Sequence, residues 1–163
     1  MKFKNKTWLI VFVVALLIQG IFPIQGNASS DIILLKGQSV YVPVYSHIYH
    51  GDRDKPKPFD LTVTLSIRNT DPKQEIVILS VDYFDSEGNL LKHYLEKPKN
   101  LKNLGTIRYV IKKRDKTGGS GAKFIVRWKS KEFVNAPLIE AIMISTESSQ
   151  GISFISRGQA IQE

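Results

Sequence analysis

Apolar and polar residues alternate along most of the chain from residue 39 onward, a two-residue period typical of β-strands with one buried face. The clearest run is residues 60–69, where Leu and Val or Ile at odd positions alternate with Thr, Ser and Arg. Runs of this kind, separated by turn residues every 8–12 positions, predict about eight strands. The predicted strands are 39–45, 60–69, 75–85, 89–95, 104–113, 123–129, 138–146 and 151–156.

This pattern predicts an all-β domain, and an immunoglobulin-like sandwich of two antiparallel sheets is preferred over a small barrel. In residues 75–85 the odd positions, from Val77 to Tyr83, are expected to share one face of the strand. Residues 85–89 predict a hairpin turn in which Gly88 supplies a positive φ. Pro43 cannot donate to a strand ladder, so it indicates a sheet edge or a bulge.

The first thirty residues have the organisation of a secretory signal peptide. Three lysines precede an uninterrupted apolar run over residues 8–18, and a small-x-small site ends at Ala28. The apolar run is shorter than the roughly 20 residues that a membrane span requires, so cleavage after residue 28 is favoured over an uncleaved anchor. The sequence therefore predicts a signal peptide at residues 1–28 and a single domain at residues 29–163, placed outside the cytoplasm, in the periplasm or secreted.

Composition excludes several classes of site. The chain has no cysteine, which rules out disulfides, thiolate metal sites and a lipid anchor on a cysteine after the cleavage site. The formal net charge is +8, and nine of the basic residues fall between Lys92 and Lys116. Such a stretch either keeps the surface soluble and protects sheet edges, or attaches to anionic polymers of the cell envelope. Nucleic acid is not an expected partner outside the cytoplasm, and the domain is expected to be a monomer.

Metal-ligating residue types gather once in the chain, at His47, His50 and Asp52. Imidazole and carboxylate groups suit zinc or a similar ion, and they would support an extracytoplasmic metal-dependent enzyme or hydrolase. A closed site needs further ligands, so the competing interpretation is two loop histidines bonded to backbone or water. No complete catalytic set and no cofactor motif is present, so the sequence favours a protein that is not an enzyme and holds no cofactor.

Aromatic residues recur every fourth position between Tyr41 and Tyr49, which favours a recognition patch at Tyr45, Ser46, His47 and Tyr49. The alternative is a row of tyrosines at a sheet edge with hydroxyls in water. A second unusual position is Asp82, which interrupts an apolar strand and is expected to pair with Arg68 or Arg127.

Four segments carry a family resemblance. They are Val40–Tyr49, Ser66–Asp71, Gly118–Ala122 and Gln150–Gly158, and together they resemble an uncharacterised family of exported bacterial proteins that is known only as a domain of unknown function. The resemblance spans about Gly37 to Ile161 and implies a bacterial source and export to the envelope. It implies no activity, cofactor or catalytic residue. The chain departs from lipid-anchored members because it has no cysteine at the cleavage site.

Three hypotheses follow. The leading one is a non-enzymatic envelope module that binds an unknown protein or polymer through a sheet face or through the loop from Tyr45 to Asp52. The others are the metal-dependent enzyme or hydrolase, and a structural module held to anionic polymers by its basic stretch. Membrane association is expected only if the N-terminal segment is not cleaved.

Overall fold

The structure is a computed structural model, and it describes residues 33–49, 57–147 and 150–162. These residues form twelve β-strands, and no helix occurs among them. Each of the eight predicted strands is found, and four short strands are added. The strands are β1 (Leu34–Pro43), β2 (His47–Ile48), β3 (Phe59–Asp60), β4 (Thr62–Arg68), β5 (Ile76–Phe84), β6 (Leu90–His93), β7 (Lys99–Leu101), β8 (Thr106–Ile111), β9 (Lys123–Asn135), β10 (Leu138–Glu147), β11 (Gln150–Arg157) and β12 (Gln159–Ile161).

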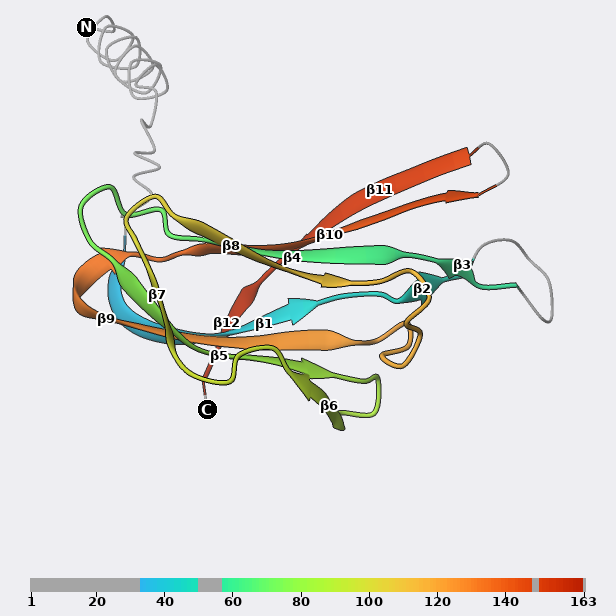
Figure 1. The fold of residues 1–163 in the computed structure, drawn as a ribbon, viewed down its shortest axis with the longest axis horizontal. Helices are drawn as coiled ribbons and strands as arrows, with labels where there is room; N and C mark the ends of the chain where they lie inside the picture. Colours follow the sequence, from blue (N-terminus) through green and yellow to red (C-terminus); the bar gives the residue numbers. More distant parts are fainter. Residues whose placement is uncertain (1–32, 50–56, 148–149, 163) are drawn as a thin grey trace, which may run out of the picture. The chain divides into compact units, whose positions relative to one another are not determined.

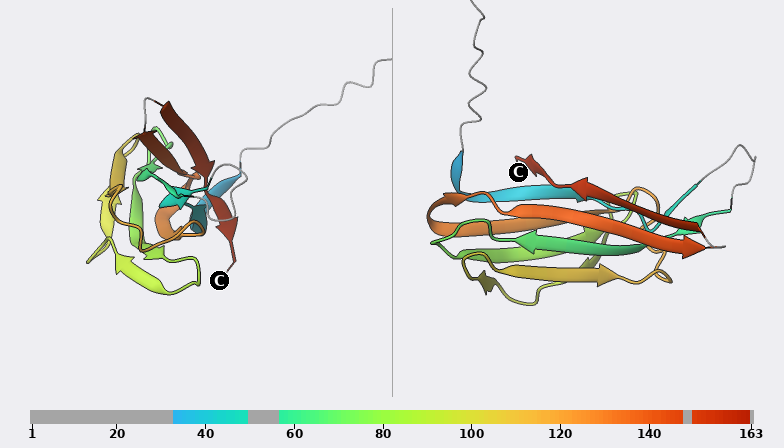
Figure 2. Two further views of the ribbon diagram at one scale, coloured as in Figure 1. Left: turned by 90° about the vertical axis from the view of Figure 1, so that its right-hand side faces the viewer. Right: turned by 90° about the horizontal axis from the view of Figure 1, so that it is seen from above.

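Two antiparallel sheets pack face to face, which confirms the predicted sandwich (Figure 1). The first sheet has the strand order β12-β1-β9-β5-β6, with β7 also paired to β5. The second has the order β11-β10-β4-β8, and β2 and β3 form a separate two-stranded ribbon. Figure 2 shows the two layers from the side and from above.

The core lies between the sheets and is built from the alternate apolar residues of the long strands. Its largest fully buried side chains include Trp128, Tyr83 and Phe124. Every buried apolar side chain among the described residues lies between Val40 and Met143. Because these residues supply the core by themselves, the domain from residue 33 onward contains the apolar residues that it needs to fold.

The prediction of which β5 side chains share a face is wrong at the beginning of the strand. Ile76 and Ile78 are fully buried, yet so are Val81 and Tyr83 further along the same strand. The register against β9 shifts between Ile78 and Ser80, which marks a β-bulge. The bulge inserts one residue and reverses the alternation, so both pairs face the core although they lie at positions of opposite parity.

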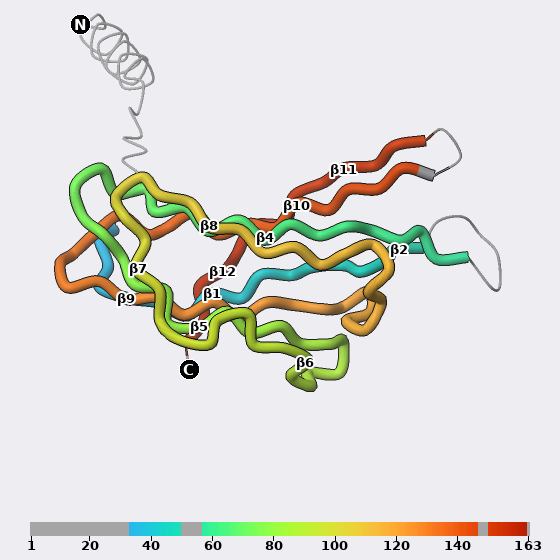
Figure 3. Tube along the Cα trace, viewed as in Figure 1, coloured from blue at the N-terminus to red at the C-terminus, as the bar shows by residue number. Residues whose placement is uncertain are grey.

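Different devices close the two open sides of the sandwich. On the β6–β8 side, Tyr94 stacks edge-on against Tyr109 and Phe124, with ring centroids 5.4 and 5.5 Å away. On the other side the chain passes from β11 in one sheet to β12 in the other at Gly158, as the tube in Figure 3 shows. The Gly158 N–H donates to the carbonyl of Ile139 over 2.8 Å, which fixes this crossing.

The turn after β5 is as predicted, with Gly88 at a φ of 91°. Pro43 is the last residue of β1 and pairs with Lys123, beyond the point where β12 pairs with β1. The predicted signal peptide and its cleavage site lie outside the described residues. No helix long and apolar enough to cross a bilayer occurs in the part of the chain that the structure describes.

Candidate functional site

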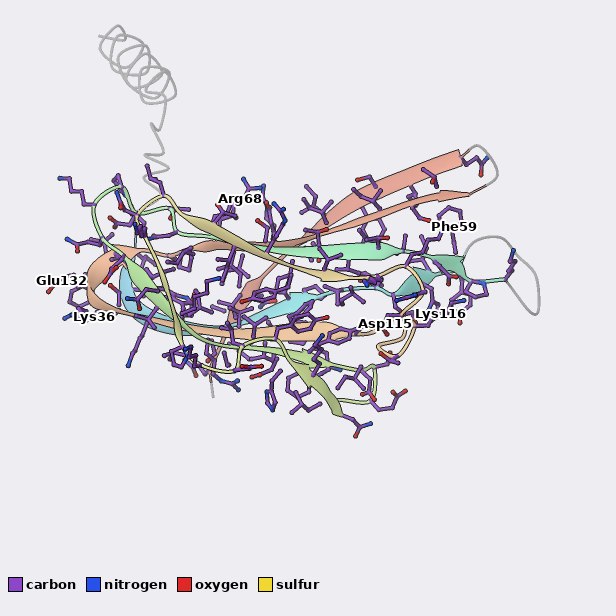
Figure 4. All side chains as sticks on the ribbon, viewed as in Figure 1. Lys36, Phe59, Arg68, Asp115, Lys116 and Glu132 are labelled. Atoms are coloured by element: carbon purple, nitrogen blue, oxygen red, sulfur yellow. The ribbon has the colours of Figure 1, made fainter. Side chains whose placement is uncertain are left out.

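An open groove of about 460 Å³ lies between the β2–β3 ribbon and the start of β11. Its walls are mainly apolar. Ile48 and Phe59, which face each other across the ribbon, contribute one side. The first three residues of β11, Gln150, Gly151 and Ile152, contribute the other. Figure 4 marks Phe59 at this end of the domain.

The groove exists because the β10–β11 hairpin is longer than the strand beside it. The pairing of β4 with β10 ends at Ile144, whereas β10 and β11 remain paired as far as Glu147 and Gln150. The hairpin therefore extends past the sheet, as Figure 1 shows, and β3 lies against β10. Ser145, which pairs with Ile152, buries a hydroxyl that has no partner among the described residues.

The outer edge of β11 presents backbone hydrogen-bonding groups that no other strand of the described residues takes up. β11 is the last strand of its sheet and, in the part of the chain that the structure describes, pairs with β10 alone. The hydrogen bond from the N–H of Gly158 to the carbonyl of Ile139 shows which residues of β11 direct their backbone groups toward β10. Because antiparallel pairs alternate between bonded and non-bonded, the N–H and C=O groups of Gly151, Ser153 and Ile155 point away from β10. No other backbone bond to these residues occurs among the described residues.

The predicted recognition residues are brought only partly together. Tyr45 is half-buried and packs edge-on against Phe154 of β11, with ring centroids 5.8 Å apart. Ser46 is fully buried. His47 and Tyr49 contact each other, with ring centroids 5.1 Å apart, and Tyr49 is exposed. The groove is lined by Ile48, the residue between them that the prediction left out.

The hydrogen bonds of Ser46 and His47 form one consistent chain. Ser46 Oγ donates to the carbonyl of Gly119 over 3.0 Å. His47 Nδ1 lies 3.0 Å from Oγ of Ser46, and His47 Nε2 lies 3.1 Å from the hydroxyl of Tyr49. A proton on Nδ1 satisfies all three contacts, because Nε2 then accepts from the tyrosine. Ser46 donates to backbone in this arrangement and is not an activated nucleophile.

The predicted metal ligands are not all described. His50 and Asp52 lie outside the described residues, so the set with His47 stays a prediction. Within residues 33–49, 57–147 and 150–162, no three His, Asp or Glu side chains are grouped to hold an ion.

Asp82 lies on the outer face of the first sheet and pairs with a basic residue, as expected. Its Oδ2 lies 2.8 Å from Nη1 of Arg127 and accepts from Ser80 Oγ over 3.0 Å. Its Oδ1 lies 2.7 Å from Nδ1 of His93. Arg68 pairs instead with Glu140, at 3.8 Å. Asp82 fixes the His93 ring through Nδ1, and no hydroxyl group of the described residues is hydrogen-bonded to Nε2 of His93.

The basic stretch from Lys92 to Lys116 is partly engaged within the domain. Lys116 pairs with Asp60 at 2.8 Å, and Lys113 donates to the carbonyl of Thr146 over 3.2 Å. The ammonium of Lys92 lies 4.4 Å from the centre of the Tyr94 ring. These contacts hold loops and strand ends in place, which agrees with a structural role for at least three of the nine cations.

The sequence did not indicate Phe59, Gln150 and Ile152 as groove residues. Phe59 precedes the other two by about ninety positions, and they meet through the pairing of β2 with β3 and the overhang of β10 and β11. The alternating pattern gives no signal for this overhang, because the predicted strand 138–146 is no longer than the predicted strand 60–69.

Comparisons with known proteins give a family and no activity. A family model described as a protein of unknown function (DUF3124) matches residues 37–161. No curated protein matches the chain. A solved structure titled as Thermotoga maritima 1070 is similar at a TM-score of 0.43 and 9% identity, covering 75% of this chain and 92% of that one.

Proposed function

Since the chain belongs to the DUF3124 family, whose function is unknown, we propose from the geometry that it is a non-enzymatic binding module of the bacterial cell envelope. In this proposal the domain acts outside the cytoplasm and binds an extended segment of a partner protein beside β11. The observation that carries the proposal is the unpaired edge of β11, which leads directly into the groove.

An added strand suits the chemistry of this edge. Alternating N–H and C=O groups at Gly151, Ser153 and Ile155 are satisfied together by another extended backbone. Side chains at alternate positions of such a strand would point toward the groove, where Ile48, Phe59 and Ile152 offer an apolar wall. The buried Ser145 hydroxyl adds a polar group near the same place.

Ser46 is fully buried and bonded to backbone, so it is not exposed as a nucleophile. The metal-dependent enzyme or hydrolase based on His47, His50 and Asp52 stays a separate prediction, because His50 and Asp52 lie outside the described residues. The attachment of the basic stretch to anionic polymers is less favoured, because several of its cations already have partners inside the domain.

The test uses a library of random dodecapeptides displayed on phage and the domain of residues 33–163. We expect enriched peptides with apolar residues at alternate positions. Ser153→Pro removes only an outward N–H, so it should reduce binding by about tenfold, the loss expected for one hydrogen bond and a displaced strand, while stability is retained. Ser153→Thr keeps the N–H and serves as the matched control.

A second variant tests the groove. Ile152→Asp places a charge on the apolar wall and should abolish binding of the enriched peptides. The proposal fails if no peptide is enriched, or if the enriched peptides bind Ser153→Pro as tightly as the unmodified domain.

A further inference from the structure

Four large apolar side chains are exposed at the end of the domain opposite the groove. Leu104 is 65% exposed and Phe133 is 63% exposed, and Ile33 and Leu34 at the start of the domain are 72% and 47% exposed. In Figure 4, Lys36 and Glu132 mark this end, and Phe59 and Lys116 mark the other.

Hydrogen bonds hold the segments of this end together. The N–H of Leu104 donates to the carbonyl of Asp71 over 3.2 Å. The carboxylate of Asp71 accepts from the N–H of Asn135 over 3.2 Å, and Asn135 pairs with Leu34 in the ladder between β1 and β9. The exposed apolar residues therefore belong to one region of the surface, which we call the basal end.

Leu104 occupies a backbone conformation that leucine rarely adopts. Its φ is 55°, in the left-handed region where a Cβ costs roughly 1–2 kcal/mol and glycine or asparagine is usual. Packing does not account for leucine here, because most of the side chain is in solvent. Strain of this kind commonly marks a functional position.

The charges at the basal end are mainly positive. The carboxylate of Asp71 is taken up by three backbone N–H groups, from Lys73, Gln74 and Asn135. The Lys36 ammonium lies 4.8 Å from the centre of the Phe133 ring. The exposed charged side chains of the region are those of Lys36, Lys73, Lys102, Lys129 and Lys131, against Glu75 and Glu132.

From these observations we propose that the basal end docks on the surface of an anionic lipid bilayer. Exposed aliphatic and aromatic side chains insert at the level of the headgroups, and lysines around them attract anionic lipids.

The chain direction agrees with this orientation. The basic and apolar segment of residues 2–18 precedes the domain, which begins at the basal end, so export brings this end to the membrane first. If the segment is retained, residues 19–32 reach about 50 Å at most, which keeps the basal end near the bilayer.

The experiment measures co-sedimentation of the domain, residues 33–163, with vesicles of phosphatidylglycerol and phosphatidylcholine in equal parts. Vesicles of phosphatidylcholine alone provide the neutral comparison. We expect binding to the anionic vesicles that weakens several-fold between low and physiological salt, since lysines supply part of the attraction.

The diagnostic variant is Leu104→Gly, because its effects on folding and on binding differ. Glycine accepts the φ of 55° without strain, so thermal unfolding should stay within a few degrees of the unmodified domain. Vesicle binding should fall by about tenfold, since an inserting leucine is lost. Phe133→Ser should add to this loss.

Controls come from equally exposed apolar residues elsewhere in the domain. Val110 and Ile144 are 47% and 50% exposed on the outer face of the second sheet. Val110→Ser and Ile144→Ser should leave vesicle binding unchanged. The proposal is overturned if the domain does not sediment with anionic vesicles, if Leu104→Gly binds as well as the controls, or if soluble polyphosphate binds while vesicles do not. None of these outcomes bears on peptide binding at β11.

Discussion

The network around Asp82 gives a quantitative prediction for folding stability. Its side chain is only 8% exposed, while those of Arg127 and His93 are 35% and 66% exposed. The perturbation is Asp82→Asn, which removes the negative charge and keeps the shape of the side chain.

The size of the effect follows from these exposures. Removing one partner of a fully buried ion pair costs about 3–5 kcal/mol, whereas exposed pairs are worth about 0–1 kcal/mol. Arg127 is partly reached by water, so we expect Asp82→Asn to lower the free energy of unfolding by about 2 kcal/mol. For a domain of this size, that corresponds to a melting temperature lower by about 6–8 °C.

A double-mutant cycle divides this effect between the two partners. Combining Asp82→Asn with Arg127→Met should give a coupling energy of about 1.5 kcal/mol, because the 2.8 Å contact involves a nearly buried carboxylate. The cycle with His93→Gln should give less than about 0.5 kcal/mol, since that ring is mostly in water.

Urea unfolding followed by tryptophan fluorescence measures these energies. The domain from residue 33 onward contains a single tryptophan, Trp128, which is 2% exposed and so reports loss of the core. The reasoning is refuted if Asp82→Asn is as stable as the unmodified domain, or if the His93 cycle gives a larger coupling energy than the Arg127 cycle.

Two further predictions concern acid stability and the crossing between the sheets. In the folded domain, hydrogen bonds from the backbone N–H groups of Lys73 and Gln74 lower the pKa of Asp71 below its ordinary value of 3.8. The stabilisation that the Asp71 carboxylate contributes is therefore present above pH 3.8, and it is lost as the pH falls through the lower pKa of the folded state. Asp71→Asn should therefore be less stable at pH 7 and lose less stability on acidification, as urea unfolding at several pH values would show; equal acid sensitivity would contradict this. Gly158→Ala would place a Cβ 2.5 Å from Val40 Cγ1, so it should destabilise the domain by about 1–3 kcal/mol in thermal unfolding. Gly151→Ala, whose Cβ would lie 3.9 Å from its nearest neighbour, is the control and should cost little; equal melting temperatures for the two variants would contradict the prediction.

The strands and the sandwich could be predicted from the sequence because burial of one face imposes a two-residue period. The faces of β5 could not, because its bulge near Leu79 reverses that period without a Gly or Pro to mark it. The pairing of Asp82 with a basic residue was predictable in kind. The choice of Arg127 over Arg68 was not, because it depends on which strands are neighbours: β5 pairs with β9, whereas Arg68 lies on β4 in the other sheet.

The recognition patch at Tyr45, Ser46, His47 and Tyr49 stays a prediction. The segment that contains it borders the groove, and Ile48 is the residue of that segment that lines the groove. A period of two in this segment would place Ser46 and Ile48 on one face, but the chain bends after β1 and the short ribbon redirects Ile48. Contacts between residues as distant as Ile48 and Ile152 depend on sheet order, which alternation alone does not determine.

The most direct test of the central claim is amide hydrogen exchange of the domain by NMR, with and without an enriched dodecapeptide. In the isolated domain, the N–H groups of Ser153 and Ile155 should exchange quickly, whereas those of Ile152 and Phe154, which face β10, should be protected. With the peptide bound, Ser153 and Ile155 should become protected as well. The claim is contradicted if the peptide binds and these two amides still exchange at their original rates.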